Sequence, residues 1–142
     1  MRISTPAPAP LPTAKDIMVS TGLITFRPQQ QISEAIHTMV QRAISGAPVV
    51  DEHMNLLGML SEFDCLRVIV TGAYEGTTVD GSRTVAELMT TDVTTIDPSL
   101  NLYGIAQTFL TRGLRRLPVV EGRRVLGQLS RRDVLKAVQR LI

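Results

Sequence analysis

The sequence contains two copies of one segment, and this internal repeat limits the possible folds more than any other feature. The stretch "GMLSEFDCL" at residues 58–66 and the stretch "GQLSRRDVL" at residues 127–135 share the pattern Gly-x-Leu-Ser-x-x-Asp. Other matches keep the same order, including Met18 with Met89 and "APVV" with "LPVV". The offset between matching residues changes only from 71 to 69, so two single-residue gaps align the halves. Such a repeat indicates duplicated structural units.

Each copy predicts the same elements in the order β-α-β-β-α, preceded by a short helix that carries the methionine (residues 15–18 and 85–89). A brief strand follows, over Leu23–Phe26 in one copy and Thr94–Ile96 in the other. The next two strands form a hairpin, and a final helix begins at Ser61 or Ser130.

The helix between the strands has an apolar face in both copies. Ser33 and Ser99 lie near the two helix starts, where a serine side chain can cap free N–H groups. We therefore expect both residues to act as caps. The apolar positions are Ile32, Ala35, Ile36, Met39, Val40 and Ala43 in the first copy, and Leu102, Ile105, Ala106, Phe109 and Leu110 in the second.

The predicted fold class is α/β (α+β), with the two repeats packed as a pseudo-twofold pair. One repeat is too small to bury a stable core, so the two copies must cover each other. Aromatic residues make up 4% of the chain and Trp is absent, which predicts an aliphatic core. The predicted segments are a flexible Pro/Ala-rich leader (1–14), the first repeat (15–73), a connecting loop (74–84, within "TGAYEGTTVDGSRT") and the second repeat (85–142).

The charge distribution and the cysteine content indicate which ligands and which cellular compartment suit this chain. Residues 100–142 contain nine basic and two acidic residues, a net charge of +7, whereas the rest of the chain has a net charge of −5. The basic part should attract anions. One cysteine, Cys65, excludes an internal disulfide and favours the cytoplasm, and with only two separated histidines a zinc site is not expected. No segment has the length and hydropathy of a membrane span.

The repeated Ser-x-x-Asp has two interpretations that share one geometry. As a capping box, the serine and aspartate satisfy backbone N–H groups at a helix start. As a binding motif, the N–H groups and the serine hydroxyl can hold phosphate oxygens, and the carboxylate can accept hydrogen bonds from both ribose hydroxyls. Repetition of the motif, with Gly-x-Leu before it, favours a binding role in addition to capping.

These features together resemble the CBS domain, which is named after cystathionine β-synthase. The β-α-β-β-α repeat, the "PVV" strand and the Gly-x-Leu-Ser-x-x-Asp ending carry the resemblance over residues 15–140. Two tandem copies resemble a Bateman module. The resemblance implies a regulatory unit that binds AMP, ADP, ATP or S-adenosylmethionine in clefts between the repeats, and often a disc-like homodimer of modules. It also implies control of a partner protein, which the sequence does not identify.

Carried over to this sequence, the resemblance assigns one cleft to the second repeat. Ser130 would contact phosphate and Asp133 the ribose, while Thr94 would face the base through its backbone. Basic residues beside the strand and the serine would bind phosphate, since the guanidinium group pairs well with phosphate oxygens. The remaining candidates in this repeat are Arg115, Arg116, Leu117, Arg131 and Arg132.

The first repeat offers Ile24, Ala47, Ser61 and Asp64 at the matching positions. It has no arginine at the equivalents of Arg115 and Arg116, and its Glu62 would repel a polyphosphate. Three alternatives are open for this cleft: it binds a less charged adenosine compound, it uses an arginine of the second repeat, or it stays empty. We therefore expect the substitution Asp133→Ala to weaken nucleotide binding more than Asp64→Ala does.

The sequence thus predicts a stand-alone module, not an enzyme, that senses an adenine nucleotide. No phosphate-binding Gly-x-x-x-x-Gly-Lys loop or nucleophile elbow is present. Two alternatives remain open at this point: a ligand-free structural or dimerisation module, and a nucleic-acid-binding protein that uses the basic half. The second is weaker because that half has few aromatic residues for stacking on bases.

Overall fold

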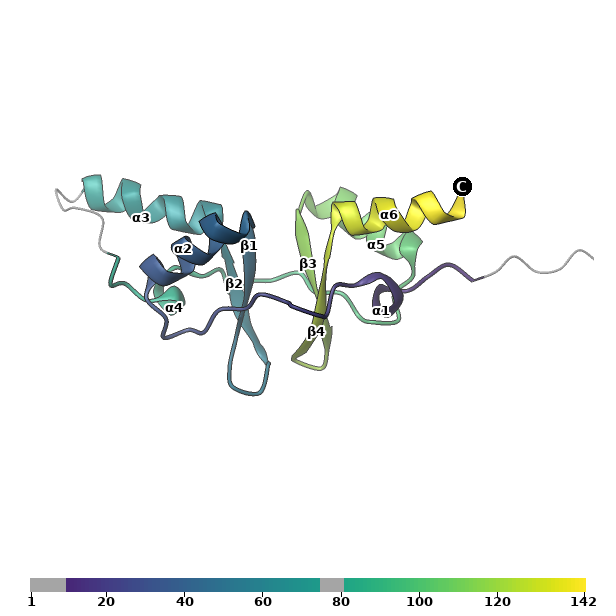
Figure 1. Cartoon of the computed structure of the whole chain (residues 1–142), viewed down its shortest axis with the longest axis horizontal. Coiled ribbons are helices and arrows are strands. Elements are labelled where there is room, and N and C mark those ends of the chain that lie inside the picture. The colour runs from purple at the N-terminus through teal and green to yellow at the C-terminus, as the bar shows by residue number, and fades with distance from the viewer. Residues whose placement is uncertain (1–9, 75–80) are drawn as a thin grey trace, which may run out of the picture.

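A computed structural model describes residues 10–74 and 81–142, with the backbone alone for residues 71–74, and its elements repeat in two halves (Figure 1). The first half contains α2 (Ile32–Arg42), β1 (Gly46–Val50), β2 (Leu56–Ser61) and α3 (Glu62–Tyr74). The second contains α5 (Leu102–Arg112), β3 (Arg116–Glu121), β4 (Arg124–Ser130) and α6 (Arg131–Leu141). The short helices α1 (Ala14–Ile17) and α4 (Val85–Leu88) precede the two halves. This order confirms the predicted fold class of two tandem repeats.

Each half is organised around an antiparallel hairpin, β1 with β2 and β3 with β4. The two helices of the half lie against its hairpin, and their apolar residues fill a separate core in each half. Both cores are mainly aliphatic, as expected, with Phe26 as the largest buried side chain of the first and Phe109 in the second.

The two short helices are exchanged between the halves. In Figure 1, α1 lies beside the second half and α4 beside the first. Ala14 of α1 is fully buried in the core of the second half, and its N–H donates to the carbonyl of Leu100. Val85 of α4 is fully buried in the core of the first half, and its N–H donates to the carbonyl of Gln30. Each core is therefore completed by a segment that the other repeat contributes.

Two glycines allow the exchanged segments to approach the hairpins. The backbone of Val19 pairs with Gln128 in both directions, at N···O distances of 2.9 and 3.0 Å, next to Gly127. A Cβ atom on Gly127 would lie 2.8 Å from both the carbonyl oxygen of Val19 and the sulfur of Met18. The equivalent Gly58 lies against Met89 and Thr90 in the same way, with 2.7 Å to the carbonyl oxygen of Thr90. The glycine of the repeated Gly-x-Leu-Ser pattern is thus required by backbone contact between repeats.

The strands expected over Leu23–Phe26 and Thr94–Ile96 are wrong as continuous elements. Only Phe26 and Ile96 pair with a strand, in isolated parallel bridges to Val49 and Val119. The reason is the exchange: residues 20–25 cross from one half to the other, so only the end of the segment reaches the edge of β1.

The expected serine caps are also wrong. Gln31 occupies the N-cap of α2, so Ser33 is the second residue of the helix. Asn101 caps α5 through its side chain, which accepts from the N–H of Gly104, while Ser99 bonds to Asp97 in the preceding turn.

The connecting segment begins later than expected, because α3 continues to Tyr74. Residues 75–80 of the predicted loop and residues 1–9 of the predicted leader lie outside the described residues.

The close glycine contacts generate a prediction about stability. The substitution Gly127→Ala should lower the free energy of unfolding by about 1–3 kcal/mol, because the added methyl group meets backbone that cannot move away cheaply. Urea denaturation measures this change, and Gly58→Ala should have an effect of the same size. Hydrogen exchange at the Val19 and Gln128 amides should also become faster in Gly127→Ala.

The substitution Gln107→Ala, at an exposed position of α5, is the control and should change stability little. A Gly127→Ala protein as stable as Gln107→Ala would show that the exchanged segment does not need the close approach.

Candidate functional site

The two Ser-x-x-Asp motifs form capping boxes, and both stand at the junction of a strand and a helix. At α6, the Oδ2 atom of Asp133 accepts from the backbone N–H of Ser130 at 2.8 Å, and Ser130 Oγ accepts from the N–H of Asp133 at 3.2 Å. Ser61 and Asp64 make the same pair of bonds at α3, at 2.8 and 3.3 Å. A cap of this kind contributes about 1 kcal/mol to stability.

The larger of two clefts, with a volume of about 490 Å³, lies between the repeats beside the start of α3. Its volume falls within the range of about 300–1,000 Å³ that is typical of small-molecule sites. One wall comes from the first repeat and the other from the second. The lining residues are Ser45, Gly46, 59–64, Leu66, Thr90, 92–94 and 113–116.

The smaller cleft, of about 250 Å³, lies beside the start of α6. Its polar side chains are Ser130, Asp133, Gln128 and Arg116, and its remaining wall is apolar or glycine. Those other lining residues are Val19, Gly22, Leu23, Ile24, Ile44 and Gly46.

The candidate residues are grouped differently in the structure, because each cleft takes residues from both repeats. Arg115 and Thr94 of the second repeat line the larger cleft together with Ser61 and Asp64 of the first. Conversely, Ile24 of the first repeat lines the cleft of Ser130 and Asp133. The exchange of α1 and α4 causes this pairing, because the residues that follow each short helix are drawn across to the hairpin of the other repeat.

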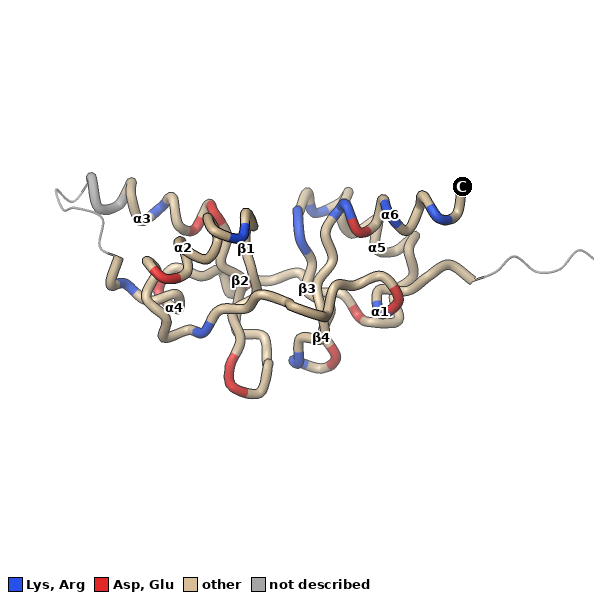
Figure 2. The backbone as a smooth tube through the Cα atoms, in the orientation of Figure 1, with Lys and Arg blue, Asp and Glu red and all other residues tan. Residues whose placement is uncertain are grey.

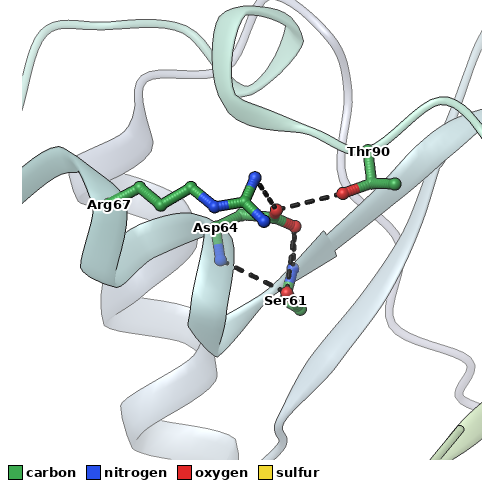
Figure 3. Close-up of polar contacts among 4 residues, drawn as sticks. All are labelled: Ser61, Asp64, Arg67 and Thr90. Atoms are coloured by element: carbon green, nitrogen blue, oxygen red, sulfur yellow. Dashed lines mark hydrogen bonds and ion pairs between the residues drawn. The ribbon is translucent and has the colours of Figure 1, made fainter.

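Asp64 is held by a network that uses both of its oxygens (Figure 3). Only 1% of the residue is exposed. Its Oδ2 accepts from the N–H and hydroxyl groups of Ser61, and its Oδ1 accepts from Thr90 Oγ1 at 3.0 Å and Arg67 Nη1 at 3.3 Å. Thr90 comes from the segment after α4, so this network links the two repeats. The Arg67 side chain is 70% exposed and can leave without breaking a core contact.

Asp133 has a freer carboxylate than Asp64. Its Oδ2 accepts from the Ser130 N–H and hydroxyl groups, whereas its Oδ1 has no hydrogen-bond partner among residues 10–70 and 81–142. The difference follows from the sequence, since Val19 stands in the smaller cleft where Thr90 stands in the larger one.

The arginines do not act as one phosphate-binding group. Figure 2 shows basic residues at the end of α5, at the start of β3 and along α6. Arg116 lines both clefts and donates from Nε to Ser45 Oγ across the repeats at 3.2 Å. Arg131 instead donates to the carbonyl oxygens of Leu114 and Gly113 at the C-terminal end of α5. That contact suits a cation, since the carbonyl end of a helix carries partial negative charge.

Three further candidates lie outside both sets of lining residues. Arg132 is exposed on α6, while Leu117 and Ala47 are buried in the two cores. The prediction of a ligand contact for these residues, as for Arg131, has no support from the cleft geometry.

Thr90 and Gln128 are two of the cleft residues that the sequence did not predict. Each departs from its counterpart in the other repeat, Val19 and Met59 respectively. A comparison of unlike residues at equivalent positions would have identified both.

Among residues 10–74 and 81–142, no helix is long and apolar enough to cross a membrane. Within the same residues, no group of three or more His, Cys, Asp or Glu side chains could hold a metal ion.

Comparison with known proteins places these observations in one family. The family model of the CBS domain matches residues 14–71 and 85–140, which are the two repeats. The CBS domain-containing protein YhcV of Bacillus subtilis is 32% identical over 123 residues, which cover 86% of this chain and 82% of YhcV. Other curated relatives are longer, and the chain spans 40% and 35% of the length of two of them.

Two solved structures contain adenosine compounds. The structure of CBSX2 in complex with AMP has a TM-score of 0.79 and 28% identity, covering 92% of this chain and 98% of CBSX2. The CBS domain pair of protein MJ0100, in complex with 5′-methylthioadenosine and S-adenosyl-L-methionine, has a TM-score of 0.73 and 26% identity. That match covers 94% of this chain and all of the MJ0100 pair.

Cys65, which follows Asp64 in α3, has the properties of a packing residue. Burial raises the pKa of its thiol above the ordinary value, and the nearby carboxylates of Asp64 and Glu62 raise it further. A raised pKa leaves less thiolate at neutral pH, and the thiolate is the reactive form.

We predict that a thiol-alkylating reagent modifies the folded protein at pH 8 more slowly than it modifies the chain in urea. The measurement is the rate of iodoacetamide labelling by mass spectrometry. Because the folded pKa is raised, Cys65 contributes stability below the unfolded pKa, and this contribution is lost as pH rises through the folded pKa. Faster labelling of the folded protein would contradict the assignment.

Proposed function

This chain belongs to the CBS domain family, and on that premise we propose that it is a regulatory module that binds an adenine nucleotide in the larger cleft. The ligand class is AMP, ADP, ATP or a related adenosine compound such as S-adenosylmethionine. AMP and S-adenosyl-L-methionine are bound by the CBS pairs of CBSX2 and MJ0100. The observation that carries the proposal is the joint construction of this cleft, with a Ser-x-x-Asp helix start on one wall and two arginines on the other.

Each part of a nucleotide has a matching group in the larger cleft. The Ser61 hydroxyl and the first turn of α3 suit a phosphate group, since helix N-termini carry free N–H donors and partial positive charge. Arg115 and Arg116 add two guanidinium groups to the opposite wall. Phe63 and Val93 give the base apolar contact. Glu62, Asp64 and Asp92 also line the cleft, and their charge favours one phosphate over three.

The carboxylate of Asp64 is the ribose-binding group in this proposal. In the ligand-free protein its Oδ1 already receives two hydrogen bonds, from Thr90 and Arg67. Two ribose hydroxyls would take the places of these donors, so the number of hydrogen bonds to the oxygen stays the same. Binding would then release Arg67 and the link between Asp64 and Thr90, which joins the two repeats.

Such a release supplies a regulatory signal. A ligand changes the behaviour of a protein only if it favours one arrangement over another. A nucleotide that contacts both walls would stabilise one relative position of the repeats and would alter the surface around Arg67. The proposal includes a partner protein that responds to this change, and the sequence and structure do not identify it.

Replacement of Arg115 tests the phosphate role. Arg115 is exposed and lines the larger cleft, so Arg115→Ala should leave the fold intact. It should weaken AMP binding about tenfold, because one charge-assisted hydrogen bond to the phosphate is lost. Adenosine has no phosphate, so its binding should stay unchanged. Arg112→Ala is the matched control, since it removes the same charge from the exposed end of α5 outside the cleft. Calorimetric titration with AMP and adenosine measures both effects.

Equal losses for AMP and adenosine in Arg115→Ala, or the same loss in Arg112→Ala, would contradict a phosphate contact. This proposal implies the opposite of the ranking of Asp133 and Asp64 expected from the sequence. Asp64→Ala should now reduce AMP binding more than Asp133→Ala, because the arginines face Asp64.

A second part of the proposal is a homodimer formed through the helices. The helices α3 and α6 lie along the same edge of the molecule (Figure 1) and expose large apolar side chains. On α3 the net charge of the described side chains is negative, with Glu62, Asp64 and Arg67, whereas α6 is strongly basic. Charge complementarity therefore favours packing of α3 on α6 of a second copy. The large exposed apolar residues are Phe63, Leu66, Ile69 and Val70 of α3 and Leu135 and Leu141 of α6.

The substitution Leu135→Gln should raise the dimer dissociation constant about tenfold, since it removes an apolar side chain from the centre of the interface. Sedimentation velocity over a concentration series measures the constant. Leu11→Gln, at an exposed leucine outside the helices, is the control. A monomeric wild-type protein at every concentration would refute the dimer without affecting the nucleotide proposal.

A further inference from the structure

The two segments that cross between the repeats are attached by matching backbone bonds but by different side chains. After α1, Val19 and Gln128 exchange two N–H···O bonds, at N···O distances of 2.9 and 3.0 Å. After α4, Thr90 and Met59 exchange the same two bonds, both at 2.8 Å. Since the backbone bonds match at these pairs, the side chains distinguish the two attachments.

The segment after α4 has an additional side-chain bond to the first repeat. Thr90 Oγ1 donates to Asp64 Oδ1 at 3.0 Å, and only 1% of Asp64 is exposed. A hydrogen bond to a buried carboxylate is stronger than one between neutral groups. Met59, which pairs with Thr90, has a thioether that needs no hydrogen bond. The segment after α4 is therefore held by its backbone pair and by a charge-assisted bond.

The segment after α1 lacks this bond and buries an unsatisfied polar group. Val19 stands at the equivalent of Thr90, has no hydroxyl and is 46% exposed. Asp133 Oδ1 consequently has no partner among residues 10–70 and 81–142. Within the same residues, the buried Oε1 atom of Gln128 has no hydrogen-bond partner either. A buried polar atom without a partner destabilises the arrangement that buries it.

The unsatisfied oxygen lies on the side of the hairpin that this segment covers. Residues directly opposite each other in an antiparallel pair project to the same face, so the side chains of Val19 and Gln128 are neighbours. Both line the smaller cleft. If the pair separates, water reaches the carboxamide of Gln128. Separation thus relieves a cost that the attachment of Thr90 to Met59 does not carry.

A hinge is available beside the weaker attachment. Residues 20–25 make no backbone hydrogen bond with the described residues, and the next backbone bond runs from the N–H of Phe26 to the carbonyl of Pro48. Gly22, in the middle of this stretch, has a positive φ of 69° and open space around its Cα atom. The chain can therefore bend here without breaking the bond of Phe26.

We propose that residues 14–25, here called the strap, open from the second repeat as one unit while the equivalent segment with α4 stays closed. In the open state Gln128 Oε1 is hydrated, and Ala14 leaves the core of the second half. The strap takes Leu23 and Ile24 out of the wall of the smaller cleft. A molecule that fills this cleft contacts the strap and favours the closed state. The strap thereby converts occupancy of the cleft into a change at the surface around α1.

Hydrogen exchange of the ligand-free whole chain, followed by NMR, measures the opening of each segment. Relative to their intrinsic rates, the amides of Val19 and Gln128 should exchange on the order of tenfold faster than those of Thr90 and Met59. Opening as one unit predicts that the amide of Ala14 shows the same opening equilibrium as Val19. Stepwise fraying would instead release Ala14 more often than Val19 and leave Gln128 protected, which would overturn the proposal.

Two reciprocal substitutions test the cause of the difference. Val19→Thr copies Thr90 and provides a hydroxyl donor for Asp133 Oδ1, so it should slow exchange of the Val19-position and Gln128 amides about tenfold. Thr90→Val removes the bond to Asp64 and should accelerate exchange at Met59 by a similar factor. Each variant is the control for the other, since each should leave the opposite segment unchanged.

A third substitution tests the contribution of the unsatisfied oxygen. Gln128→Met copies Met59, removes the buried polar group at similar volume, and should slow exchange at Val19 and Ala14. Slowing of all amides alike, Val85 included, would mean a gain in global stability and would overturn an opening confined to the strap. If a variant fails to fold, the comparison of the two segments in the wild-type protein decides.

These outcomes are independent of the nucleotide proposal, because every measurement is made without a ligand. Equal exchange at the two attachments of the wild-type protein overturns the strap and leaves nucleotide binding in the larger cleft unaffected. A protein that binds no nucleotide but shows the unequal exchange refutes the proposed function and supports the strap.

Discussion

The structure depends on backbone pairing between each hairpin and the segment that follows the short helix of the other repeat. Val19 with Gln128 and Thr90 with Met59 make the same two-way bonds, and a glycine beside each pair allows the contact. These pairs carry α1 and α4 into the opposite cores. They also bring residues 92–94 and 22–24 to the helix starts of the other repeat, and this is what creates the clefts. Neither cleft has a complete wall without the exchange.

The sequence predicted the parts of the fold that are encoded locally. The hairpins, the apolar helix faces and the helix starts at Ser61 and Ser130 follow from periodicity and capping chemistry, and the repeat shows that they occur twice. The caps Ser33 and Ser99 failed because a serine near a helix start competes with neighbouring polar residues, here Gln31 and Asn101, for the N-cap position. The assignment of Arg115 and Thr94 to the cleft of Asp133 failed for another reason. A repeat pattern shows which residues are equivalent, but it does not show which repeat each one faces.

The two repeats have the same backbone structure, but their side chains at equivalent cleft positions differ in chemistry. Several pairs of equivalent positions differ where they line the clefts, among them Thr90 and Val19, Met59 and Gln128, and Arg116 and Gly46. The first pair decides whether the aspartate oxygen is occupied. The second places a carboxamide in one cleft only. The third leaves one guanidinium group, that of Arg116, where two would stand if the repeats were identical, and its Nε donates to Ser45 Oγ of the other repeat. Duplication thus gave one scaffold with two dissimilar surfaces.

The exchange of α1 and α4 has a consequence for the origin of the chain. A protein made of one such repeat could complete its core only by trading its first helix with another molecule, since Ala14 and Val85 fill cores that are not their own. Two separate copies that did so would form a reciprocal, twofold-symmetric assembly. Joining their genes end to end would convert that assembly into the present chain without moving any contact. The internal symmetry of the present chain is the symmetry that such a dimer would have.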